Sequence, residues 1–177
     1  MAWSTPLTAT ATTALTAAQW NASVRDNLLE TAVAKATTAG SHFVATGPNA
    51  LAERILDDAI VDTSETSTST SYTNLATNGP VLTATTGTQA LSWLQCSMSN
   101  TNAAAGTYAS LEISGATTLA ASDARGLYLQ SPAGYDVRCG VCTLNATTPG
   151  SNTFRMQYKV ASGTGTWLRR RLIVMPL

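Results

Sequence analysis

NTFRMQYKV, residues 152–160, is the stretch that most clearly sets the fold class of this 177-residue chain. Apolar and polar residues alternate along it, with Phe154, Met156, Tyr158 and Val160 against Arg155, Gln157 and Lys159. Alternation with a period of two is typical of a β-strand that buries one face. The stretch therefore predicts a strand with one face on a core and the other in solvent or against a neighbouring subunit.

Further strand candidates lie on both sides of this stretch, separated by short segments rich in Gly, Pro and Asn. They are Ser69–Leu75, Val81–Thr85, Gln89–Met98, Thr107–Ser114, Gly126–Gln130, Tyr135–Leu144 and Thr166–Met175. About a quarter of all residues are Thr or Ser, a composition that suits strands and turns. Since no crossover helices separate these runs, we expect a mainly β protein with an antiparallel, jelly-roll-like β-sandwich over residues 63–177.

The N-terminal part contains one helix signal, TAAQWNASVRDNLLE at residues 16–30. Thr16 and Gln19 have the spacing of a capping box, which predicts a helix start. Trp20, Val24 and Leu28 recur every four residues and form an apolar stripe, beside which lie Asn21, Arg25 and Asp26. Such a short helix cannot make a core alone, so we predict that the stripe packs on a partner subunit or on the β-domain, and that the three polar residues fix its register.

The segments around this helix complete an anchoring region over residues 1–62. Residues 1–15 form a Thr/Ala-rich arm, in which Trp3 favours contact with a partner over a free tail. Gly40 suits the left-handed conformation after a helix. Residues 41–56 predict either a hairpin around Gly47-Pro48-Asn49 or, for residues 49–60, a second helix. The polar segment 57–70 reads as a linker into the first strand, with the domain boundary near Asp62.

Composition excludes several functional classes. Only 11% of residues are charged and the formal net charge is zero, which gives no reason to expect a nucleic-acid partner. Up to Glu65 the acidic residues outnumber the basic ones by four, and after Glu65 the basic residues outnumber the acidic ones by four. This distribution would suit neighbouring copies in which the acidic part of one packs against the basic part of the next. We expect no transmembrane helix, because no run of 18 apolar residues occurs, and no signal peptide, because the N-terminus lacks positive charge and a continuous apolar segment.

The sequence also predicts no catalytic, metal or cofactor site. The single histidine, His42, has no nucleophile motif beside it. Asp57, Asp58 and Asp62 lack the spacing of a calcium loop, so we expect a solvated acidic segment. Cys139 and Cys142 form a C-x-x-C pair but lie in a predicted strand, where residues three apart face opposite sides. We expect these two thiols and Cys96 to be reduced and structural, as in a protein assembled in a cytoplasm.

Three consecutive arginines, Arg169, Arg170 and Arg171, form the densest cluster of charge. Strict alternation would place Arg169 and Arg171 on one face with Trp167, and Arg170 on the other with Leu168, Leu172 and Val174. We predict a salt-bridged sheet face or an intersubunit contact with the acidic N-terminal part, and we expect Arg170, if buried, to be paired.

Three stretches resemble proteins of bacteriophage virions. Trp3 followed by LTAAQWN (15–21) and VRDNL (24–28) is similar to a leader of the form W…(L/V)TAA-x-(L/W)N-x-x-(V/I)RDNL. ATTAGSHFVATGPNALAERIL, residues 36–56, is similar to a ribbon in phage fibre-like proteins, although Ser41-His42 and Glu53 depart from its usual form. Residues 69–100, 114–117 and 144–160 resemble the C-terminal β-domains of such proteins, which are often trimeric and jelly-roll-like.

This resemblance implies a non-enzymatic structural protein on the virion surface, assembled in the host cytoplasm. It implies a homotrimer bound to a major capsid protein or a tail protein, without cofactor, nucleic acid or membrane. We favour a capsid decoration, or cement, protein because the chain is short, lacks a repeated shaft and carries its β-domain directly after the arm. The alternatives are a minor tail or fibre protein, and a module that binds host glycan through loops 100–106 and 131–135, where Tyr135 offers an aromatic ring.

Overall fold

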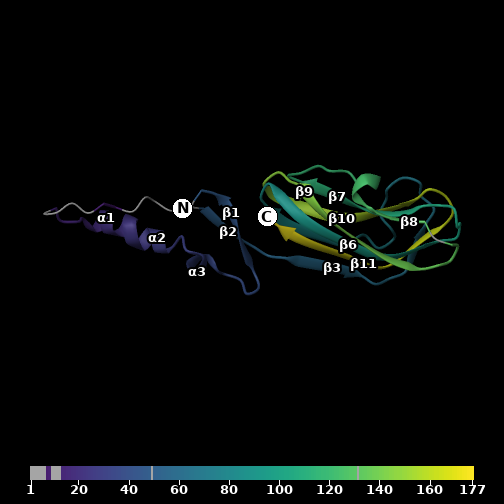
Figure 1. Cartoon of the computed structure of the whole chain (residues 1–177), viewed down its shortest axis with the longest axis horizontal. Helices are drawn as coiled ribbons and strands as arrows, with labels where there is room; N and C mark the ends of the chain where they lie inside the picture. The colour runs from purple at the N-terminus through teal and green to yellow at the C-terminus, as the bar shows by residue number, and fades with distance from the viewer. Residues whose placement is uncertain (1–6, 9–12, 49, 131) are drawn as a thin grey trace. The chain divides into compact units, whose positions relative to one another are not determined.

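The computed structural model describes residues 7–8, 13–48, 50–130 and 132–177 (Figure 1). The chain forms two compact units, residues 1–55 and residues 56–177. The first unit holds the helical segment and a hairpin, and the second holds two antiparallel sheets. The protein is therefore mainly β, as the alternation in the sequence predicts.

The predicted helix is present and begins at the predicted cap. α1 (Ala17–Trp20), a π-helical turn η1 (Asn21–Arg25) and α2 (Asp26–Leu28) follow one another without a break. The Thr16 hydroxyl accepts a hydrogen bond from the Gln19 N–H at 3.2 Å, and the Gln19 side chain accepts one from the Thr16 N–H at 2.9 Å. This reciprocal pair confirms the capping box.

A short helix and a hairpin complete the first unit. α3 (Ala32–Lys35) precedes Gly40, which has the positive φ of 79° expected after a helix. β1 (His42–Gly47) pairs antiparallel with β2 (Ala50–Arg54). The structure therefore decides between the two alternatives for residues 41–60 in favour of the hairpin, and the second helix is wrong.

The second unit contains two antiparallel sheets. One has the order β3 (Asp57–Val61), β11 (Gly165–Pro176), β6 (Gln89–Asn100) and β9 (Val137–Ala146), with β4 (Glu65–Ser67) also paired to β11. The other has the order β5 (Val81–Thr86), β10 (Gly150–Val160), β7 (Thr107–Gly115) and β8 (Leu127–Leu129). A 3₁₀ turn, η2 (Asp123–Arg125), precedes β8. The arrangement is consistent with a β-sandwich.

One core contains the inward side chains of both sheets. Phe154, Met156, Tyr158 and Val160 of β10 are buried, as their alternation predicts. They share this core with side chains of the other sheet, namely Leu94, Cys96, Met98, Trp167, Leu172 and Val174. The two layers are therefore joined by apolar burial, which is the main stabilising term for such a fold.

Seven of the eight predicted strands are present, with ends shifted by a few residues. Ser69–Leu75 is the exception, because it makes only an isolated bridge from Thr73 to Tyr158. The predicted linker 57–70 instead contributes β3 and β4, both paired to β11. Accordingly, the compact units divide between Ile55 and Leu56, whereas the sequence placed the boundary after Asp62.

A β-bulge in β11 changes which arginine faces the core. Two residues of β11, Arg169 and Arg170, lie opposite a single residue of β6, and Arg169 adopts a φ of 51°. The extra residue puts Trp167 and Arg170 on the same, buried face, although residues three apart face opposite sides in a regular strand. Arg170 shares its face with Leu172 and Val174, as alternation predicts, whereas the predicted placement of Trp167 on the opposite face is wrong.

Candidate assembly interface

The apolar stripe of the N-terminal helix is largely exposed to solvent. Trp20 and Leu28 have exposed fractions of 56% and 59%, while Val24 between them is half-buried. Residues of the stripe are four apart, which is more than the 3.6 residues of one α-helical turn, so in a regular α-helix the stripe would wind around the axis. The π turn of η1 contains more residues per turn and reduces this winding. The stripe therefore runs nearly parallel to the helix axis, as a surface that a partner can cover.

The predicted register residues lie at the surface of the same helix. Arg25 donates a hydrogen bond to Asp26 at 2.8 Å, and this pair is exposed. Leu7 of the arm donates its N–H to the Ser23 hydroxyl at 2.8 Å, which brings part of the arm to the helix. Trp3, the other predicted anchoring residue, lies outside the described residues.

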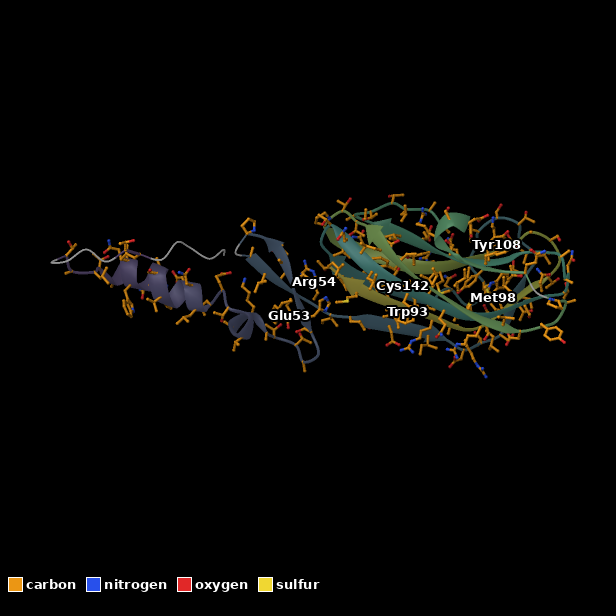
Figure 2. All side chains as sticks on the ribbon, in the orientation of Figure 1. Glu53, Arg54, Trp93, Met98, Tyr108 and Cys142 are labelled. Atoms are coloured by element: carbon orange, nitrogen blue, oxygen red, sulfur yellow. The ribbon has the colours of Figure 1, made fainter. Side chains whose placement is uncertain are left out.

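Glu53 ties the segment after α3 to the hairpin (Figure 2). Its carboxylate accepts hydrogen bonds from the Ser41 hydroxyl at 2.6 Å, the Thr37 N–H at 3.0 Å and the Thr38 N–H at 2.9 Å, as well as from the Thr37 hydroxyl. These hydrogen bonds lower the pKa of Glu53 to about 2, and the bond from Ser41 has the largest effect. The carboxylate thus replaces the capping partners that residues 37–41 otherwise lack.

We expect this connection to loosen in acid. A group with a lowered folded pKa stabilises the fold above its unfolded pKa, so the contribution of Glu53 is complete above its ordinary value of 4.5 and is lost as the pH falls toward about 2. The protection factors of the Thr37 and Thr38 amides, measured relative to the intrinsic exchange rate at each pH, should fall in that range, and Glu53→Gln should lower them already at neutral pH. Glu112→Gln, which removes a 3.7 Å ion pair in the sandwich, should leave both amides unchanged. Equal protection in Glu53→Gln and the wild type would contradict the role of Glu53.

The three consecutive arginines have different surroundings. Arg170 is fully buried and forms an ion pair with Glu65 at 3.2 Å. Arg171 pairs with Asp58 of β3 at 2.8 Å, at the surface. Arg169 at the bulge is exposed. The predicted pairing of Arg170 is confirmed, and its partner lies within the same chain. Arg170 and Arg171 are thus paired with acidic residues that precede β5 in the chain. Arg169, which is exposed, is the arginine whose side chain can contact another subunit.

Other residues considered in the sequence form no reactive centre. His42 is half-buried in β1, opposite Arg54. The three cysteines are free: Cys96 is buried, Cys139 is half-buried against the core, and Cys142 is exposed, so the expectation of buried thiols is wrong for Cys142. Within the described ranges, no three His, Cys, Asp or Glu side chains gather closely enough to hold a metal ion. None of the helices described is long and apolar enough to cross a membrane.

The structure brings together aromatic residues that the sequence did not single out. Lys159, Tyr108 and Tyr128 lie side by side on the outward face of the four-stranded sheet, where the two tyrosine rings are 5.0 Å apart. The Lys159 ammonium lies 4.6 Å from the Tyr108 ring and 2.7 Å from Asp123. Gln130 connects this group to loop 100–106 by a 3.1 Å hydrogen bond to Ala104. Of the second predicted glycan loop, Tyr135 is exposed and Ser131 lies outside the described residues.

Comparison with known proteins adds no identification. No protein-family model matches the sequence, and no curated protein is significantly similar to it.

Proposed function

We propose that this chain is a non-enzymatic structural protein of a bacteriophage virion, most specifically a homotrimeric capsid decoration protein. The observation that carries the proposal is the exposed stripe of Trp20, Val24 and Leu28 on a capped helix outside the sandwich. Exposed apolar side chains in a row mark a contact with another protein. The arm and helix are the anchor, and the sandwich is the part that the anchor holds on the particle.

We further propose that the sandwich is a jelly roll. Its support is the order of strands within the sheets. In each sheet a strand from the end of the chain, β11 or β10, lies between an early strand and the middle strands. Such a return beside the first strand is the feature that defines a Greek key, and a jelly roll contains two of them.

The decisive experiment counts copies of the protein in purified virions. Quantitative mass spectrometry against the major capsid protein should give hundreds of copies if the protein decorates the capsid. A few copies per particle would instead support the alternative of a minor tail or fibre protein. Absence from virions, together with a strictly monomeric protein in light scattering, would overturn the structural role altogether.

A second candidate, binding of host glycan, has one observation in its favour. Tyr108 and Tyr128 provide a partly exposed aromatic surface bordered by Lys159, Asp123 and Gln130. Aromatic faces with adjacent hydrogen-bonding groups are suited to sugar rings. A glycan array should then show binding that Tyr128→Ala removes, whereas an array without hits at high protein concentration excludes this function.

A further inference from the structure

The two sheets of the sandwich have different outward faces. The four-stranded sheet turns mainly polar residues outward, among them Lys159, Gln157, Arg155, Glu112 and Thr153. The other sheet turns outward two rows that cross three strands: Ile173, Trp93 and Cys142 in one, and Met175, Leu91 and Leu144 in the next. Figure 2 shows Trp93 and Cys142 on the sandwich. The outer face of a sandwich exposed to water is normally polar, so this second face has the composition of a covered surface.

The polar groups among these rows already have partners within the chain. Arg171 donates two hydrogen bonds to Asp58, at 3.1 and 2.8 Å. Arg138 donates one to Gln95 at 2.8 Å. Covering the face would therefore bury the charge of Arg171 together with that of Asp58, and not as an isolated charge. Arg138 bonds a neutral amide and is exposed, so its charge belongs at the border of the face. Trp93, Gln95, Arg171 and Ile173 also line a shallow hollow of ≈ 130 Å³ that a partner side chain can enter.

We propose that this apolar outer face, defined by the rows of Trp93 and Leu91, packs against a second copy of this chain. The inference rests on the homo-oligomer of the proposed function and names its contact. The two rows are part of the whole outer side of this sheet, in which β6 is twelve residues long and four strands lie side by side. At strand spacings of about 4.8 Å and rises of about 3.3 Å per residue its area is roughly 600 Å². That is most of the ~800 Å² per partner in a stable interface. The formal net charge of the chain is zero, so no overall repulsion opposes packing of this face against a second copy.

The chain contains its own probe of this contact, the exposed thiol of Cys142 on β9, the edge strand that carries one end of the Trp93 row. Native wild-type protein is treated with N-ethylmaleimide, and each cysteine is followed by mass spectrometry. In the oligomer, Cys142 should react at least about tenfold more slowly than after dilution to single chains, because a thiol must be accessible to react. Cys96 and Cys139, which face the core, should not respond to dilution.

A matched pair of variants tests the same contact by mass. Trp93 and Tyr128 are each 53% exposed, on the outward faces of opposite sheets. Trp93→Glu should reduce the particle mass in light scattering to that of one chain, and Tyr128→Glu should leave the wild-type mass. Circular dichroism and thermal unfolding check that both variants fold, and the thiol measurement on the wild type needs no variant.

The outcomes separate this inference from the function on which it rests. A wild-type oligomer with freely reactive Cys142, and with unchanged mass in Trp93→Glu, overturns the contact and leaves the virion role standing. A wild-type chain that is monomeric at every concentration overturns both the contact and the homotrimer. Protection of Cys142 that is lost in Trp93→Glu and kept in Tyr128→Glu supports the proposal.

Discussion

Arg170→Ala should lower the free energy of unfolding of the sandwich by about 3–5 kcal/mol, the usual cost of leaving one member of a buried ion pair alone. Arg170 is fully buried, and its partner Glu65 is nearly so. The guanidinium also donates to the Thr77 carbonyl at 3.3 Å, to the Gly79 carbonyl at 3.4 Å and to the Thr63 hydroxyl at 3.1 Å. Its removal takes one donor from each of these acceptors, of which the Gly79 carbonyl is buried, and urea denaturation measures the loss.

The charge state of Glu65 supports this expectation. Burial alone would raise the pKa of Glu65, but hydrogen bonds from Thr77 and the positive charge of Arg170 more than offset this, so the pKa is lowered. Glu65 is therefore ionised at neutral pH, and Arg170→Ala leaves a carboxylate without its cation. The side chain of Arg170 also lies 5.5 Å from the Tyr158 ring, an attraction that the variant loses as well.

The neighbouring arginine provides the control. Arg171→Ala removes a surface ion pair with Asp58, for which the expected loss is at most about 1 kcal/mol. The double variant Arg170→Met with Glu65→Leu should recover much of the stability, because it replaces the buried pair by apolar groups of similar volume. Equal losses in Arg170→Ala and Arg171→Ala would show that Arg170 does not hold the sandwich together.

The contrast between the two arginines also shows what the sequence can predict. The alternation of side chains along β11 correctly placed Arg170 on the same face as Leu172 and Val174, because the residues after Arg170 continue a regular strand. It could not assign Trp167, because the bulge at Arg169 depends on pairing with β6, about seventy residues earlier in the chain. Nor could it find Glu65 as the partner, since only the fold brings β4 to β11.

Local signals were more informative than non-local ones. The capping box of Thr16 and Gln19 lies within four residues, so the sequence alone predicts it. The strands β3 and β4 were missed because β4 is polar throughout and β3 begins with two aspartates, residue types that edge strands accept. Ser69–Leu75 has residues suited to a strand, yet it finds one bridging partner only.

The assembly surfaces follow the same division. The helix stripe could be predicted because one helix contains all of it. The apolar outer face could not, because Ile173, Trp93 and Cys142 become neighbours only through pairing of three strands. The group of Tyr108, Tyr128 and Lys159 was missed for the same reason. The strand Gln89–Met98 has apolar residues on both of its faces. This was the signal in the sequence that the outer face of its sheet would be apolar as well.

Replacement of Trp20 and Leu28 by serine should release the protein from the virion while leaving its fold and oligomeric mass unchanged. Full burial of a large apolar side chain stabilises a contact by about 1.5–3 kcal/mol, and both side chains are already partly covered, so we expect about half of that from each. The pair then accounts for about 1.5–3 kcal/mol, or a loss of affinity between about tenfold and a hundredfold. The measurement is the ratio of this protein to the major capsid protein in purified particles.

Val33→Ser is the matched control for this double variant. Val33 is 88% exposed and lies in α3, outside the stripe, so its replacement removes apolar surface without touching the predicted contact. Particles formed with this variant should contain the wild-type amount of protein. Arg25→Ala should give an intermediate reduction if the exposed pair with Asp26 fixes the register of the helix. Normal incorporation of the double serine variant would assign attachment to another part of the chain, whereas normal incorporation with a reduced oligomeric mass would make the helix a contact between copies.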